Sequence, residues 1–278
     1  MRLVTFVAGE KAAHPGLVVD GGIFDLGVEG FKDAIAFMGA PRSVQADVAR
    51  SRATIALEAV QLLAPVPNPP RIFGIGVNYA EHAVESGTKT RDVPTVFMVL
   101  SSAVVGPGAD VVLPRTSSMV DYEAELAVVI GKSGHRIAAS QWEEHVFGYT
   151  IMNDVSARDV QRATTQWTLG KSFPTFAPMG PWVVTKDEIA DPHQLGISLT
   201  IRGEKLQNSN TSQMIFKIPA LIEYLSGIVP LQVGDVISTG TPAGVGMGRA
   251  PQRWLKAGEE MVVAIEGIGE LRNPVVAE

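Results

Sequence analysis

The sequence predicts an α+β protein in which a β-rich domain follows a small α/β unit. From Arg71 onward, short apolar runs of strand length follow one another, separated by Gly, Pro, Asn and Asp. Few stretches of this part have helical periodicity, which favours a curved or rolled sheet over a doubly wound fold. A proline-rich segment, from Pro65 to Pro70, precedes it and can continue neither a helix nor a central strand. We therefore expect a small domain at residues 1–68 and a larger one at 69–278.

The first unit combines short strands with two helical stretches. A Gly21-Gly22 turn separates its second and third predicted strands. The predicted strands are Leu3–Val7, Leu17–Val19 and Ile23–Leu26, and the predicted helices are Phe31–Met38 and Val44–Leu63.

The second unit contains most of the predicted strands. They are Ile72–Val77, Thr95–Val99, Glu125–Ile130, Val146–Met152, Trp182–Thr185, Ile197–Ile201, Val236–Thr239 and Met261–Ile265, followed by a final strand after the closing Gly-Ile-Gly turn. Helices are expected after Asn78, after Asp154 and over Ile218–Gly227.

Composition excludes several classes of protein. The chain has 23 Lys+Arg against 29 Asp+Glu and no basic run, so we expect no nucleic-acid partner and no membrane partner. Without cysteine there can be no disulfide and no thiol nucleophile, and a metal site would need oxygen or nitrogen ligands. No apolar run reaches the roughly 18 residues of a membrane helix, and the N-terminus lacks a signal-peptide core. We expect a cytoplasmic protein.

Acidic residues precede the most apolar strand. Asp121, Glu123 and Glu125 alternate along the chain just before Leu126–Ile130, so in an extended chain they point to one face. Like charges at that spacing repel one another, and a hard cation such as Mg²⁺, Mn²⁺ or Ca²⁺ would turn this repulsion into attraction. The alternative is a solvated strand edge, where charge costs little.

Three other segments carry candidate functional groups. Asp154 follows a strand and could be a third metal ligand or an ordinary helix N-cap. His82 and Glu85 share a helix face, as a water-activating pair or as a surface pair. Lys171 lies in an apolar setting, where it could bind a substrate carboxylate or extend to solvent. The loop from Ser238 to Gly246 lacks a P-loop ending; its amides could approach an anionic substrate or form a tight turn.

These segments, in their order and in their amino-acid sequences, resemble the fumarylacetoacetate hydrolase family. The resemblance covers residues 71–276 and depends on the stretches N-Y-A-E-H-A-V-E-S-G, D-Y-E-A-E-L-A-V-V-I-G-K, G-Y-T-I-M-N-D-V-S-A-R-D-V-Q, G-K-S-F, M-G-P-W-V-V-T, N-T-S-Q-M-I-F and G-D-V-I-S-T-G-T-P-A-G-V-G. The first unit is similar to the small N-terminal domain that many bacterial members carry.

The resemblance implies a fold, a cofactor and roles for individual residues. It implies a mixed β-sheet roll, a homodimer, and Mg²⁺ or Mn²⁺ bound by the metal ligands Glu123, Glu125 and Asp154. It implies that His82 and Glu85 form a catalytic dyad on a mobile lid and that Lys171 is catalytic. The substrate-binding positions that it implies are Tyr79, Arg158, Gln161, Lys171 and Thr241. The chain departs from the family pattern at Val99-Leu100, where many members have Lys-Pro, and at Pro174, where aspartate is frequent.

The function that the resemblance implies is hydrolysis of a carbon–carbon bond in a small 2,4-dioxo acid, such as an acylpyruvate. Pyruvate and a carboxylic acid would be released. The alternatives are an oxaloacetate-type decarboxylase or an oxo/enol tautomerase that uses the same metal site. A non-catalytic metal-binding protein is a third hypothesis, against which the His82–Glu85 pair argues.

Overall fold

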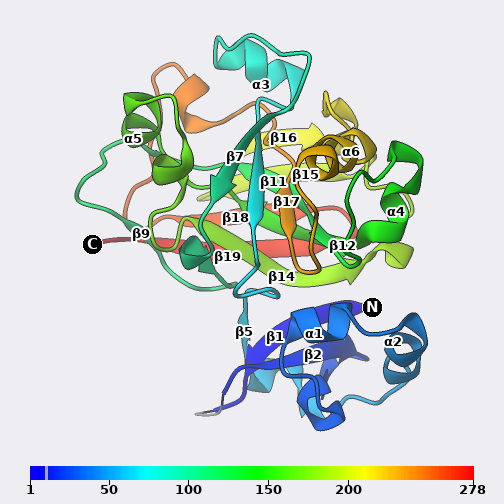
Figure 1. Cartoon of the computed structure of the whole chain (residues 1–278). Helices are drawn as coiled ribbons and strands as arrows, with labels where there is room; N and C mark the ends of the chain where they lie inside the picture. Colours follow the sequence, from blue (N-terminus) through cyan, green and yellow to red (C-terminus); the bar gives the residue numbers. More distant parts are fainter. Residues whose placement is uncertain (10–11) are drawn as a thin grey trace.

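The structure is a computed structural model that describes residues 1–9 and 12–278. The chain forms two lobes, a smaller one at the bottom of Figure 1 that contains the N-terminus and a larger one above it. No helix within the described residues is long and apolar enough to cross a membrane.

The smaller lobe is a sheet covered by two short helices. β2 pairs with β1 and with β3, both antiparallel, and the Asp33 carboxylate accepts a hydrogen bond from the Ala36 amide to cap the first helix. The elements are β1 (Arg2–Val7), β2 (His14–Val19), β3 (Gly22–Asp25), α1 (Ala34–Met38), α2 (Arg42–Val48), β4 (Ile55–Ala56) and β5 (Gln61–Leu63).

The helix predicted over Val44–Leu63 is wrong beyond its first turn. α2 ends at Val48, and the chain then forms β4 and β5, which pair with β3 and β1. Ile55, Leu57, Val60 and Leu62 pack on a small core of Val4, Phe6 and Ile23. Pairing with strands elsewhere in the unit satisfies the backbone here, and this tertiary effect overrides the local helical periodicity.

The larger lobe contains the remaining strands and helices. These are β6 (Ile72–Gly76), β7 (Thr95–Val99), β8 (Val104–Val105), β9 (Val111–Leu113), β10 (Val120–Asp121), β11 (Ala124–Ile130), β12 (Val146–Asn153), β13 (Ser156–Ala157), β14 (Ala177–Thr185), β15 (Gly196–Ile201), β16 (Glu204–Asn210), β17 (Val236–Ser238), β18 (Glu260–Ile265) and β19 (Gly269–Ala277), with α3 (Ala80–Glu85), α4 (Trp142–His145), α5 (Arg158–Ala163) and α6 (Ile218–Ile228).

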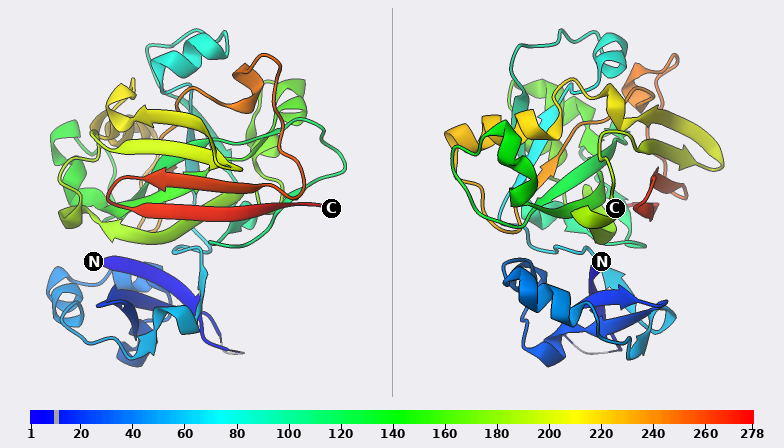
Figure 2. Two further views of the ribbon diagram at one scale, coloured as in Figure 1. Left: turned by 180° about the vertical axis from the view of Figure 1, so that it is seen from behind. Right: turned by 90° about the vertical axis from the view of Figure 1, so that its right-hand side faces the viewer.

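Two mixed sheets organise the described residues. The large one has the order β4-β3-β2-β1-β14-β12-β11-β17-β6-β7, and the smaller one has the order β16-β15-β18-β19-β9. Figure 2 shows the smaller sheet on the back of the larger lobe, with β18 and β19 in red. Mixed sheets with few helices confirm the predicted α+β class.

β11 is apolar on both faces because both faces are buried. Leu126, Val128 and Ile130 belong to the main core of the larger lobe. Ala127 and Val129 alternate with them and belong to a second core, which also contains residues of the smaller lobe. The strand therefore lies in the middle of the protein, between β12 and β17.

The two lobes share this second core and one sheet. Leu3 of β1 pairs with Val183 of β14, and the Phe37 and Phe147 rings, one from each lobe, lie 6.4 Å apart. Several elements were not predicted from the sequence. Among them are β16, whose sequence is too polar to be read as a strand, and a short strand, β13, which separates Asp154 from α5. Asp154 is therefore not an N-cap.

Candidate active site

Antiparallel pairing of β11 and β12 places three carboxylates together. Ala124 pairs with Asn153, so the start of β11 lies beside the end of β12. Glu123 and Asp154 are the residues just outside this pair, and the Asp154 amide donates a 2.9 Å hydrogen bond to the Glu123 carbonyl. Carboxylate oxygens of Glu123, Glu125 and Asp154 lie within 4.8 Å of one another, and all three residues are buried.

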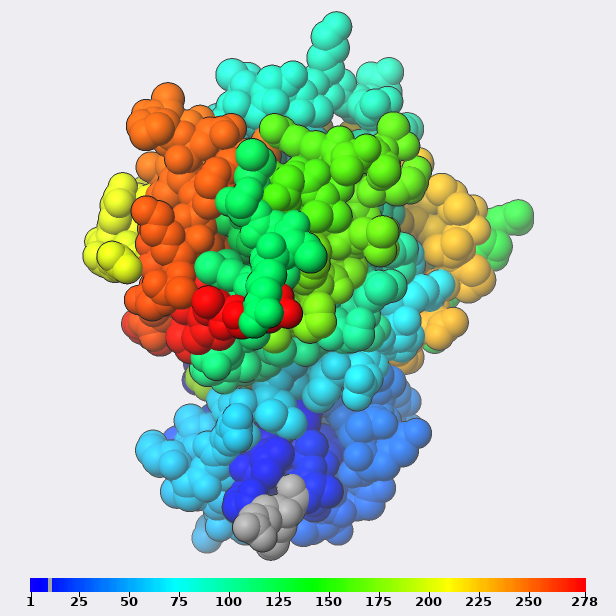
Figure 3. All heavy atoms as spheres, turned by 90° about the vertical axis from the view of Figure 1, so that its left-hand side faces the viewer, coloured from blue at the N-terminus to red at the C-terminus, as the bar shows by residue number. Residues whose placement is uncertain are grey.

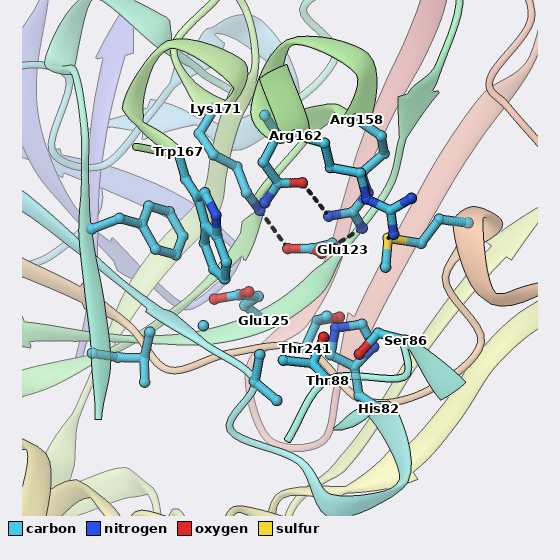
Figure 4. A pocket seen from close by; sticks show the side chains of 16 residues that line it. His82, Ser86, Thr88, Glu123, Glu125, Arg158, Arg162, Trp167, Lys171 and Thr241 are labelled. Atoms are coloured by element: carbon cyan, nitrogen blue, oxygen red, sulfur yellow. Dashed lines mark hydrogen bonds and ion pairs between the residues drawn. The ribbon is translucent and has the colours of Figure 1, made fainter. Parts of the chain in front are cut away.

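Two buried cations contact this carboxylate cluster. Lys171 Nζ lies 2.6 Å from Glu123 Oε2 and 2.7 Å from Asp154 Oδ2. Arg158 Nη2 lies 2.6 Å from Glu123 Oε1 (Figure 4). Burial favours the neutral form of Lys171, but Asp154 and Glu123 outweigh it and raise the pKa of the lysine. Lys171 is therefore a cation and not a base.

The three carboxylates differ in how strongly these cations stabilise their charge. Burial alone would raise the pKa of Glu123, but Arg158 and Lys171 lower it to about 2. Burial raises the pKa of Asp154 to about 6 despite Lys171. Burial, together with Asp154 and Glu123, raises the pKa of Glu125 well above its usual range. Two of the three carboxylates therefore lack enough positive charge around them.

The cluster fits a divalent cation. Four buried carboxylates (Asp121, Glu123, Glu125 and Asp154) face two buried cations, so the fully ionised cluster has two excess negative charges. Asp154 Oδ1 is buried without a hydrogen-bond partner among the described residues. An unsatisfied buried oxygen is costly, and coordination to a metal would satisfy it. Glu123, Glu125 and Asp154 are therefore the residues that would bind the ion.

Asp121 has a different role from its two neighbours in sequence. Its oxygens accept hydrogen bonds from the Gly246 and Met247 amides at 2.7 and 3.0 Å and from Arg158 Nε at 2.9 Å. A carboxylate with these donors has little capacity left for a metal. Asp121 and Glu123 both bind Arg158, and the chain between β10 and β11 is not a regular strand. Asp121 therefore holds Arg158 and the glycine-rich loop in place.

The amides of the glycine-rich loop bind carboxylates of the protein itself. The Gly240 amide donates to Glu125 Oε2 at 2.9 Å, and the Gly244 amide donates to both oxygens of Glu85. The sequence left open whether these amides approach a substrate or form a tight turn. They instead fix acidic side chains from three other segments, including Asp121. Ser238 adds a 2.6 Å hydrogen bond to Glu125 from the end of β17.

α3 places a histidine against the carboxylate cluster. His82 is buried and lines the cavity described below. It also contributes to the lowered pKa of Glu123, less strongly than Arg158 and Lys171 do. Its Nδ1 atom lies 3.5 Å from Glu85 Oε2, which is long for a hydrogen bond. The predicted dyad is therefore close in space, and Glu85 is held more tightly by Gly244 than by His82.

A small cavity of about 100 Å³ brings most of the predicted residues together. Figure 3 shows the segments around residues 80–90, 160–170 and 240–250 meeting at the end of the larger lobe away from the smaller one. The predicted residues that line the cavity are His82, Glu123, Glu125, Arg158, Gln161, Lys171 and Thr241. Tyr79 does not line it, and its buried hydroxyl has no hydrogen-bond partner among the described residues.

Other cavity residues were not found by the sequence reasoning. Phe97 and Trp167 form an aromatic wall, with ring centroids 5.4 Å apart. A Cβ atom on Gly76 would lie 2.3 Å from the Trp167 ring, so this wall requires glycine at position 76. Arg162 also lines the cavity, one helical turn after Arg158. The i, i+4 spacing of the two arginines was the signal that could have identified it.

The positions that depart from the family pattern lie outside this cavity. Val99 is buried in the second core and Pro174 is exposed. Neither lines the cavity, whereas Glu123, Glu125, Arg158 and Lys171 do.

Comparison with known proteins identifies a matching family and several relatives. Residues 71–276 match the family described as fumarylacetoacetate (FAA) hydrolase C-terminal. The mitochondrial oxaloacetate tautomerase Fahd2a of Rattus norvegicus is 44% identical over 289 residues, which cover 99% of this chain and 92% of that protein.

Solved structures with the same fold include a hydrolase and an isomerase. Maleylpyruvate hydrolase from Sphingobium sp. SYK-6, solved with manganese(II) and pyruvate, is 30% identical with a TM-score of 0.84, over 100% of this chain and 99% of that one. 5-Carboxymethyl-2-hydroxymuconate delta-isomerase from Mycobacterium smegmatis is 32% identical with a TM-score of 0.81, over the full length of both chains. This chain belongs to the fumarylacetoacetate hydrolase family.

Proposed function

We propose that this protein is a divalent-metal-dependent tautomerase that interconverts the enol and keto forms of oxaloacetate or a closely similar 2-oxo acid. The extended similarity to the rat oxaloacetate tautomerase supports this substrate. The observation that carries the reaction type is the position of His82, whose imidazole opens on the cavity that also contains Glu123, Glu125 and Lys171.

Conversion of the enol to the keto form removes the proton of the 2-hydroxyl group, so that negative charge develops on that oxygen, and adds a proton to carbon 3. The reverse reaction removes a proton from carbon 3 and adds one to the oxygen. His82 is suited to carry the proton of carbon 3, because imidazole is the side chain that most often acts as a general acid or base. Lys171 is held protonated by its carboxylate partners and provides positive charge for the developing oxyanion. A divalent ion bound by Glu123, Glu125 and Asp154 would supply Lewis-acid polarisation of the 2-oxo group.

The size and lining of the cavity support a compact polar substrate. Its volume of about 100 Å³ is well below the roughly 300–1,000 Å³ of sites for drug-sized ligands. The Phe97–Trp167 wall limits its extent on one side, and charged residues line the other. A four-carbon oxo acid suits this space better than an acid with a long acyl chain.

Hydrolysis of a 2,4-dioxo acid, the function implied by the sequence resemblance, is the second candidate. The closeness of His82 and Glu85 and the similarity to maleylpyruvate hydrolase favour it. Hydrolysis needs a strongly activated water, and therefore a base that is firmly hydrogen-bonded to its partner carboxylate. Because both Glu85 oxygens accept the Gly244 amide and the His82 contact is long, we favour the reaction that needs only a proton carrier.

The test follows two products from one enzyme preparation. Enol-oxaloacetate is mixed with the protein and Mg²⁺ or Mn²⁺, and the decay of enol absorbance is recorded while pyruvate is assayed separately. We expect rapid enol decay without pyruvate. The same preparation is then given acetylpyruvate and maleylpyruvate. Efficient pyruvate release from either, without acceleration of enol decay, would replace tautomerisation by hydrolysis. Pyruvate release from oxaloacetate would indicate a decarboxylase.

A further inference from the structure

Two arginines one turn apart on α5 differ in their surroundings. Arg158 and Arg162 both line the cavity, as their i, i+4 spacing allows. Arg158 is 3% exposed, and its guanidinium binds the carboxylates of Asp121 and Glu123 and the amide oxygen of Gln161. Arg162 is exposed, and its one polar side-chain contact among the described residues is with the Met247 sulfur at 3.7 Å.

The other cations of this cavity are already neutralised. Lys171 is paired with Glu123 and Asp154, and Arg158 with Asp121 and Glu123. Among the described residues that line the cavity, Arg162 is the one permanent cation without a carboxylate partner. A free guanidinium presents a planar pair of donors that matches a carboxylate, and this geometry discriminates carboxylates from neutral groups.

We propose that Arg162 binds the second carboxylate of the substrate and gives the enzyme its preference for 2-oxo dicarboxylic acids over 2-oxo monocarboxylic acids. This inference rests on the proposed function, in which the 2-oxo group lies at the ion that Glu123, Glu125 and Asp154 would hold. The distal carboxylate of a four-carbon acid then needs its own cation at the cavity wall. Figure 4 shows Arg162 on the same side of the cavity as Arg158.

The surface behind Arg162 is held by buried contacts. The backbone amide of Met247 binds Asp121, which in turn binds Arg158. The same buried carboxylate therefore contacts both the helix that carries Arg162 and the backbone of Met247, whose sulfur lies 3.7 Å from the guanidinium. Such support reduces the side-chain entropy that Arg162 loses when it binds an anion.

A second pair of cations competes for this role. Lys89 and Arg91 line a neighbouring cavity of about 80 Å³, which shares Gly76, Val77, Thr88 and Trp167 with the first. Trp167 lies between the Arg162 side and the Lys89 side, because it lines both cavities. We favour Arg162, since it lines the cavity that contains the carboxylate cluster and Lys89 and Arg91 do not.

The experiment compares R162Q and R162K with the matched control R91Q, all at exposed positions. With Mg²⁺ present, the KM for enol-oxaloacetate is measured, and oxaloacetate and pyruvate are titrated against the fluorescence of the protein. Pyruvate lacks the distal carboxylate. For R162Q we expect a rise of about tenfold to a hundredfold in KM and in the Kd of oxaloacetate, the range for a lost charged hydrogen bond. We expect an unchanged Kd for pyruvate, a smaller effect in R162K, and none in R91Q.

Two results would overturn this assignment. Equal weakening of oxaloacetate and pyruvate in R162Q would show that Arg162 supports the site in general. A selective loss of oxaloacetate binding in R91Q, with R162Q unchanged, would place the second carboxylate in the neighbouring cavity. Failure of the proposed function is distinguishable, because the wild-type protein would then not accelerate enol decay, whereas the two titrations would still report on Arg162.

Discussion

The Glu85 carboxylate accepts the backbone amide of Gly244 at 3.0 Å through Oε1 and at 3.1 Å through Oε2. This contact joins the C-terminal end of α3 to the glycine-rich loop, across a large separation in sequence. A Cβ atom on Gly248 would lie 2.1 Å from the Glu85 side chain, so the neighbouring backbone also packs closely on it. Because His82 is on the same short helix, the Glu85–Gly244 contact helps to place the imidazole at the cavity.

The first prediction concerns this contact and the order of residues 79–91. Glu85→Ala removes the acceptor, and we expect amides of α3 to exchange about tenfold faster, the scale of a lost charged hydrogen bond. Glu85→Gln keeps one oxygen acceptor and should exchange more slowly than Glu85→Ala. Hydrogen exchange with and without oxalate plus Mg²⁺ measures this, and we expect the ligand to increase protection in the wild type. Equal, high protection in all samples would indicate a rigid site.

The second prediction concerns the metal ligands. Glu125→Ala or Asp154→Ala should abolish turnover and metal binding, since two carboxylates would remain with a weaker hold on the cation. Glu81→Ala, which removes an exposed carboxylate of α3, is the control and should bind metal normally. Mn²⁺ titration of the three proteins measures affinity directly. Full activity after exhaustive treatment with EDTA would contradict the metal assignment.

The third prediction is a pH dependence of metal binding. Burial raises the pKa of Asp154 to about 6 from 3.8, so a proton competes with the metal as the pH falls through 6. Without metal, the buried charge of ionised Asp154 destabilises the folded state. This destabilisation is absent below pH 3.8, where Asp154 is protonated in both the folded and the unfolded chain, and complete above pH 6, where it is ionised in both. The rise in Tm on adding Mn²⁺ should therefore grow between pH 5 and pH 7. A rise in Tm that is constant over this range would refute the shift.

The fourth prediction concerns the proton carrier. His82→Asn should lower the rate of enol decay by at least about a hundredfold, the usual scale for a lost general acid–base group. Mn²⁺ affinity should change little, because His82 is not a ligand. His135→Asn, at an exposed histidine, is the control. Near-normal enol decay by His82→Asn would remove His82 from the reaction.

The fifth prediction concerns the two lobes. The predicted boundary between residues 68 and 69 cuts through a shared core, so we expect one cooperative unfolding transition in calorimetry. Phe37→Ala should lower the free energy of unfolding by about 3–5 kcal/mol, typical of a large cavity in a core, and shift that single transition as a whole. Two separate transitions, with only one moved by Phe37→Ala, would show lobes that fold independently.

Local patterns determined much of the fold. Strands such as Ile72–Val77 and Glu125–Ile130 were predicted within a residue of their bounds, because their apolar side chains are buried and turn residues flank them. Val44–Leu63 shows the limit of such reasoning. Its apolar residues can follow a helical or a strand period, and the unpaired edges of β1 and β3, formed elsewhere in the chain, decided between them.

The candidate site also contains residues that the sequence indicated and residues whose roles only the tertiary structure distinguished. The spacing of Glu123 and Glu125 indicated a site by sequence alone, because two like charges beside an apolar strand repel each other unless a cation offsets them. Their spacing alone does not separate Asp121 from them. The family resemblance leaves Asp121 out of the ligand set, and the tertiary structure gives the reason, since its hydrogen-bond donors come from Arg158 and from Gly246 and Met247. Only the tertiary structure distinguished Arg162, free at the cavity, from Arg158. Both are arginines on one helix face, and their difference in charge pairing arises from carboxylates that the sheet brings to one arginine and not to the other.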